Sequence, residues 1–117
     1  MNRGLVAAGA IDAGLAVAAG AFGAHALRDR LEPRALEIFE TAARYQMYHG
    51  LAIILCAVLA TSGARTAGWI MQAGIVIFSG SLYLLAATDV KMLGAITPIG
   101  GLAFLIGWAW LAISALR

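Results

Sequence analysis

Charged side chains are scarce in this chain: they account for 12% of its 117 residues, whereas hydrophobic residues account for 62%. Soluble domains carry about a quarter charged and about half apolar residues. The deficit excludes an ordinary soluble domain and predicts an integral membrane protein in the lipid bilayer. The eight basic residues are dispersed and form no basic patch interleaved with aromatic residues, so nucleic-acid binding is not expected.

Cysteine and histidine are also rare, with one and two residues respectively. Cys56 lies inside an apolar run, cannot form an internal disulfide, and is expected to be a buried structural thiol. The chain has no Ser-His-Asp order, no glycine-rich phosphate loop in a strand-turn-helix context, and no paired carboxylates. We therefore expect no catalytic residues and no enzyme activity.

Four apolar stretches are predicted to cross the membrane. The first, residues 4–26, would be about 34 Å long as a helix, against a hydrocarbon core about 30 Å thick. The rival interpretation is a secretory signal peptide, which fits less well because the stretch exceeds a usual h-region and contains Asp12. The other predicted spans cover residues 45–61, 66–88 and 93–116.

Most of the charge lies between the first two spans. Pro33 suits the first turn of a helix, and Leu36, Phe39 and Ala43 follow at helical spacing. This pattern predicts an amphipathic interfacial helix over residues 33–44. The predicted fold class is therefore all-α: a single membrane domain over residues 1–117, an antiparallel four-helix bundle with an interfacial helix between spans 1 and 2, and both termini on the same side.

The start of the last span has two interpretations. Thr97 followed by Pro98 is typical of an N-cap with proline at the first helical position, which would start the helix there. Alternatively the span is an ordinary helix from Met92 with a proline inside it. The sequence leaves both open.

Small residues recur at four-residue spacing in the predicted spans, a pattern that lets helix backbones approach closely. The predicted helix-packing residues are Gly9, Ala13, Gly20, Gly23, Gly80, Gly100 and Gly101.

Asp12 is an acid about 12 Å inside the first span. An unpaired carboxylate at this depth is costly, so Asp12 should face the bundle or be protonated. It is either a proton or cation relay or a neutral acid bonded to a neighbouring helix, and the second interpretation is favoured.

Polar side chains converge on one leaflet when the four spans are folded together. Two histidines at similar depth on adjacent helices could be axial ligands of a haem or two ligands of a metal ion, although zinc would need more. The competing and favoured interpretation is an interhelical hydrogen-bond network, with no metal or cofactor. The predicted cluster consists of His25, Tyr45, Gln46, His49, Ser79, Ser81, Tyr83 and Thr97.

Four motifs occur in order along the chain: GAFGAHALRDRL, ARYQMYHGLAI, FSGSLY, and TPIGG followed by Gly107–Trp108. Together they resemble the YgdD/YwdK-like family of small bacterial inner-membrane proteins, a domain family of unknown function with a small transmembrane relative in eukaryotes. The resemblance implies a four-span protein of the bacterial inner membrane and supplies no activity. Asp12 lies outside these motifs. The matching residues are Gly20, Gly23, His25, Tyr45, His49, Ser79, Gly80, Ser81, Tyr83, Pro98, Gly100 and Gly101.

Three hypotheses of function follow. The first is a structural or interaction protein that forms a homo-oligomer or serves as an accessory subunit of a larger membrane complex. The second is a ligand-binding protein that holds haem, a metal ion, a quinone or a lipid head group near His25 and His49. The third is conduction of protons or a small solute past Asp12.

Overall fold

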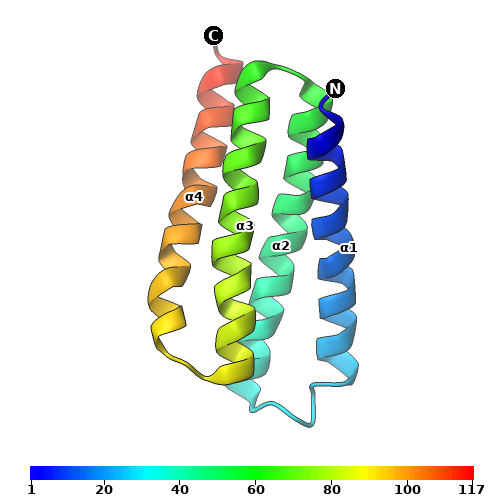
Figure 1. Cartoon of the computed structure of the whole chain (residues 1–117), viewed down its shortest axis with the longest axis vertical. Helices are drawn as coiled ribbons and strands as arrows, with labels where there is room; N and C mark the ends of the chain where they lie inside the picture. Colours follow the sequence, from blue (N-terminus) through cyan, green and yellow to red (C-terminus); the bar gives the residue numbers. More distant parts are fainter.

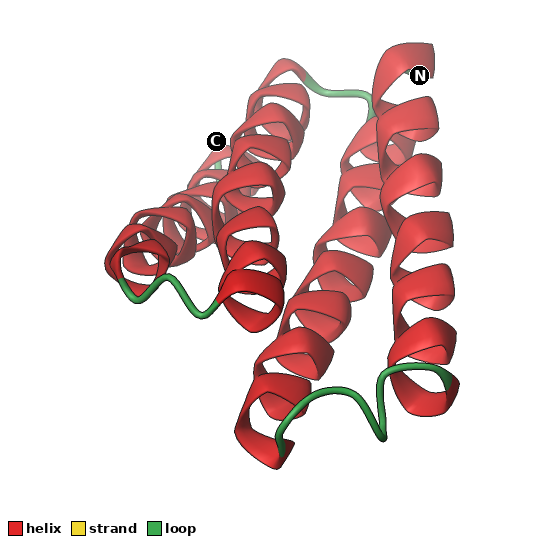
Figure 2. Ribbon diagram, turned by 60° about the horizontal axis from the view of Figure 1, so that its bottom comes forward, coloured by secondary structure: helices red, strands yellow, loops and turns green.

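The fold consists of four long helices. The computed structural model describes residues 1–117 apart from the side chain of Ala24, and no strand occurs in the part of the chain it describes. Each helix is long and apolar enough to cross a membrane, and the predicted all-α membrane bundle is confirmed. The helices, joined by short loops (Figures 1 and 2), are α1 Arg3–His25, α2 Pro33–Leu59, α3 Ser62–Thr88 and α4 Met92–Ala115.

The helices pack in chain order, as a row with two edges. α1 packs on α2, α2 on α3, and α3 on α4, with a smaller contact between α1 and α3. Both views place α1 and α4 on opposite sides of the molecule (Figures 1 and 2). The two termini lie at the same end of the bundle (Figure 1), as predicted for four antiparallel spans.

The amphipathic segment 33–44 is helical as expected, but it is not a separate helix. It forms the first turns of α2, which runs without a break from Pro33 to Leu59. The reason is that its buried side chains continue in helical phase across the predicted boundary, from Ala42 through Gln46 and His49 to Ile53. At 27 residues α2 is about 40 Å long, so it is longer than the hydrocarbon core is thick.

The structure decides where the last span begins. α4 starts at Met92 and contains Pro98, so the helix start at Thr97–Pro98 is wrong. Thr97 instead donates a hydrogen bond from its Oγ1 to the Leu93 carbonyl over 3.2 Å, one turn back in the same helix. Irregular backbone in this apolar segment would leave several amides unpaired in lipid, whereas an internal proline removes a single amide donor.

The start of α3 also differs from expectation, whereas its end at Thr88 is as predicted. The helix begins at Ser62 rather than at residue 66, because Thr61 is an effective N-cap whose Oγ1 accepts a bond from the Ala64 amide over 3.1 Å. The chain reverses between α2 and α3 at Ala60, which has a left-handed conformation with φ 61°.

Close helix packing uses some of the predicted glycines and not others. A Cβ added at Gly9 would lie 2.6 Å from the Gly50 carbonyl oxygen, and one added at Gly100 would lie 2.7 Å from the Cβ of Phe78. These two positions therefore bring α1 close to α2 and α3 close to α4. A Cβ at Gly20 or at Gly80 would meet nothing within 4 Å, so those glycines do not pack against a helix of this chain. Of the other three, Ala13 contacts Gly50, Gly23 contacts Phe39, and Gly101 makes only an ordinary contact with Phe78.

Candidate functional site

His49 is buried between α2 and α4. Its side chain is 5% exposed, and its Nδ1 lies 2.8 Å from the Tyr45 carbonyl oxygen one turn back in α2. The indole Nε1–H of Trp108, on α4, donates to its Nε2 over 3.0 Å. A carbonyl oxygen only accepts, so the proton is on Nδ1 and Nε2 is the acceptor. The imidazole is neutral, and both of its nitrogens are occupied.

An aromatic stack surrounds this ring. The His49 ring lies 3.6 Å from the Phe104 ring, centroid to centroid, with their planes 9° apart. Phe104 in turn contacts Phe78 and Tyr45, at centroid distances of 5.3 and 6.4 Å. Aromatic pairs of this kind stabilise packing beyond the area they bury. His49 thus joins α2 to α4, two helices that are not neighbours in the row.

His25 does not belong to this cluster. It is exposed in the last turn of α1, where a basic side chain complements the helix dipole. Gly50, next to His49, packs against Asp12 and Ala13 of α1. His25 is twelve residues beyond Ala13, or about 18 Å along the helix. The predicted shared depth of the two histidines is therefore wrong.

The haem and metal alternatives at these histidines do not fit this geometry. One ligand cannot bridge two side chains about 18 Å apart along the bundle. His49 also has no free nitrogen lone pair, because Trp108 occupies Nε2. Among the described residues, no group of three His, Cys, Asp or Glu side chains is arranged to hold a metal ion.

The remaining predicted residues form short hydrogen bonds that join α3 to both of its neighbours. Tyr83 donates from its hydroxyl to Gln46 Oε1 over 2.7 Å, and Ser79 donates to the Ala42 carbonyl over 2.8 Å. Both of these bonds reach α2. Ser81 faces the other way, with its Oγ 2.6 Å from Thr97 Oγ1 on α4. The FSGSLY motif therefore places alternate polar side chains on opposite sides of α3, where they hold three helices together.

Asp12 adjoins this network at Gln46, where α1, α2 and α3 meet. It is 6% exposed, with the amides of Gln46 and Gln72 next to its carboxyl group. Its Oδ2 atom and Gln72 Oε1 are both buried without a hydrogen-bond partner. Asp12 also lines a groove of about 540 Å³ between α1 and α3. This position agrees with the prediction that Asp12 faces the bundle. The side chains next to its carboxyl group are amides, which are not titratable. Conduction past Asp12 stays a prediction.

Three residues of these sites were missed from the sequence. Trp108 was named only as part of the fourth motif, and Phe104 had no predicted role. Gln72 carried a usable signal, because an amide in the middle of an apolar span is rarely left unpaired. Phe104 and Trp108 carried none, since their role depends on how α4 aligns with α2.

Comparison with known proteins agrees with the membrane fold. A family model described as "Protein of unknown function (DUF423)" matches residues 19–101. The chain belongs to the DUF423 family. It is 50% identical over 112 residues to a UPF0382 membrane protein of Staphylococcus epidermidis, covering 93% of this chain and 92% of that protein. It is 47% identical over 114 residues to the UPF0382 membrane protein YwdK of Bacillus subtilis, covering 93% of each.

The DUF423 match places the site in context. The matched residues 19–101 include His49, the FSGSLY motif and Gly100, whereas Asp12 and Trp108 lie outside them. No solved structure matches this chain. The predicted resemblance is confirmed, and with it a membrane protein whose relatives are bacterial membrane proteins. The family brings no established activity.

Proposed function

We propose that this DUF423 protein is an interaction protein of the bacterial inner membrane that associates with a second copy of itself through α1. A membrane-protein partner would use the same face if the chain serves as an accessory subunit. The observation that carries the proposal is a second small-residue face on α1 that nothing in the chain covers.

The covered face of α1 contains Leu5, Gly9 and Asp12, which pack toward α2 and α3. The opposite face is a stripe of small exposed residues at three- and four-residue spacing: Ala7, Ala10, Gly14, Ala18 and Ala21. A Cβ at Gly14 would meet nothing within 4 Å. In a bilayer, helix association depends on close backbone approach, which such a stripe permits.

The row arrangement supports this use of α1. α1 is an edge of the row, with α2 as its main neighbour (Figure 1). A symmetric pair would bring the same stripe of both copies together, which is the usual form of a membrane or soluble dimer.

Association is measured by Förster transfer between labelled copies in liposomes at decreasing protein-to-lipid ratios. Gly14→Leu places a large side chain in the stripe, and we expect it to weaken association at least tenfold. Ala112→Leu is the matched control, because Ala112 is an exposed small residue on α4 at the other edge. It should leave association unchanged. A wild-type chain that is monomeric at every ratio, or equal loss in both variants, would refute the proposal.

A further inference from the structure

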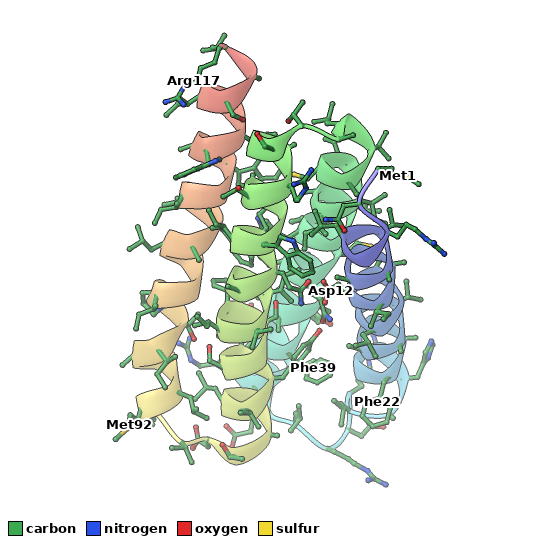
Figure 3. The ribbon with its side chains drawn as sticks, turned by 45° about the horizontal axis from the view of Figure 1, so that its top comes forward. Met1, Asp12, Phe22, Phe39, Met92 and Arg117 are labelled. Atoms are coloured by element: carbon green, nitrogen blue, oxygen red, sulfur yellow. The ribbon has the colours of Figure 1, made fainter. Side chains whose placement is uncertain are left out.

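The groove between α1 and α3 has the dimensions and composition of a small-molecule site. Its volume of about 540 Å³ lies within the usual range of ligand pockets, about 300–1,000 Å³. Figure 3 shows Asp12 and Phe39 in the space between α1 and α3. Apolar side chains make up most of its walls, and the polar ones are few. Its lining includes Asp12 and Ala19 of α1, Phe39 and Gln46 of α2, and Gly80 and Tyr83 of α3.

Two acceptor atoms in or beside the groove have no hydrogen-bond partner, although the side-chain amides of Gln46 and Gln72 lie next to Asp12. The Asp12 carboxyl is nine-tenths buried, lines the groove, and has an oxygen without a partner. The neighbouring Gln72 Oε1 is a second acceptor without a partner. The Tyr83 hydroxyl does not donate to either of these oxygens, because it donates to Gln46 Oε1. Unpaired buried acceptors are costly, so an occupant that brings a donor would be stabilised here.

The depth of Asp12 limits what that occupant can be. Asp12 is nine residues from Arg3 and thirteen from His25, or about 14 and 20 Å from the ends of α1. This position is deep in the hydrocarbon, below the level at which charged or zwitterionic lipid head groups lie. A molecule that reaches it must be apolar except for a neutral donor.

The shape of the groove favours a ring. Phe39 and Tyr83 form an edge-to-face pair 5.0 Å apart at one end, and aromatic faces of this kind accept a further planar ring. Gly80 leaves the wall open, since a Cβ there would meet nothing within 4 Å. Gly80 was predicted to pack against another helix, and its position in the groove suggests a different use.

We propose that the groove between α1 and α3 binds a lipid-soluble phenol or hydroquinone, with its ring beside Phe39, Gly80 and Tyr83 and its hydroxyl donating to Asp12. The site does not depend on the proposed self-association, because it lies on a different face of α1 from the Gly14 stripe. It also differs from the site around His49, whose two ring nitrogens are already paired.

The test uses the full chain in lipid nanodiscs and the probe 2,3,5,6-tetramethylphenol, with its methyl ether as the matched compound that lacks the donor. Equilibrium dialysis measures retention above that of empty nanodiscs, so partition into lipid is subtracted. We expect saturable retention of the phenol at least tenfold above that of the ether.

Three variants locate the binding. Gly80→Leu places a large side chain in the groove at a position where an added Cβ meets nothing within 4 Å, and should abolish retention. Asp12→Leu removes the acceptor, and should reduce the phenol to the level of the ether. Gly14→Leu adds the same side chain outside the groove, and should bind like the wild type, whatever it does to self-association.

Two results would overturn this assignment. Equal retention of phenol and ether by the wild type would mean that the groove binds apolar molecules, such as an acyl chain, without a hydrogen bond to Asp12. Undiminished phenol retention by Gly80→Leu, with its helical content intact by circular dichroism, would place the binding elsewhere.

Discussion

The bond from Trp108 to His49 allows a sharp test of what holds α4 in place. In Trp108→Phe the six-membered ring remains and the N–H donor is lost, so His49 Nε2 is left without a partner in a side chain that is only 5% exposed. An unsatisfied buried acceptor costs about 1–3 kcal/mol in soluble proteins, and interhelical hydrogen bonds in membranes average about 0.6 and reach about 1.7 kcal/mol. We therefore expect a loss of about 1 kcal/mol in the free energy of unfolding.

The measurement is an unfolding titration with a denaturing detergent in mixed micelles. Trp110→Phe is the matched control: it is the same substitution two residues away in α4, at a side chain that is 47% exposed and has no hydrogen bond in this structure. It should change the unfolding free energy by less than about 0.5 kcal/mol.

A double-mutant cycle separates the hydrogen bond from the packing. His49→Phe keeps a ring to stack on Phe104 and removes both nitrogens, so Trp108→Phe should cost almost nothing in that background. A coupling energy near zero between the two positions, or equal losses in Trp108→Phe and Trp110→Phe, would refute the role assigned to this bond.

Two further predictions concern backbone geometry and use the same unfolding assay. Gly100→Ala should destabilise the fold by about 1–3 kcal/mol, because the added Cβ would overlap Phe78, including its backbone nitrogen. Gly101→Ala, whose Cβ would lie an ordinary 3.8 Å from the Phe78 ring, should be neutral or stabilising, and similar losses at both glycines would contradict the packing described. Ala60→Gly should stabilise the fold by up to about 1 kcal/mol, since a left-handed φ of 61° is strained for alanine, and a destabilised variant would show that this strain is absent.

The residues of the FSGSLY motif show how far a pattern of polar side chains can be followed without coordinates. Ser79, Ser81 and Tyr83 were expected in an interhelical network, because a polar side chain in a membrane bundle seeks a partner on a neighbouring helix. The structure pairs all three of them. Their partners were less predictable. Ser79 donates to a backbone carbonyl, and because every residue carries this group, the sequence does not indicate which one is the acceptor.

The error over His25 has a specific cause. Both histidines flank the charged segment 27–44, and a separate surface helix there would have placed them at the same depth. Because α2 instead begins at Pro33, the segment adds three turns to the helix before His49. Nothing in the local sequence marks the difference, since an amphipathic helix on the surface and an extension of a span have the same periodicity.

The sequence by itself determined the membrane-spanning helices and the common end of the two termini, because an apolar stretch in lipid must pair its backbone groups internally. It also determined which side chains need a polar partner. Only the tertiary structure decided that His49 pairs with Trp108 and that Asp12 faces a groove between α1 and α3. Those outcomes depend on the axial alignment and rotation of whole helices, which are set by close contacts such as Gly9 on Gly50 and Gly100 on Phe78.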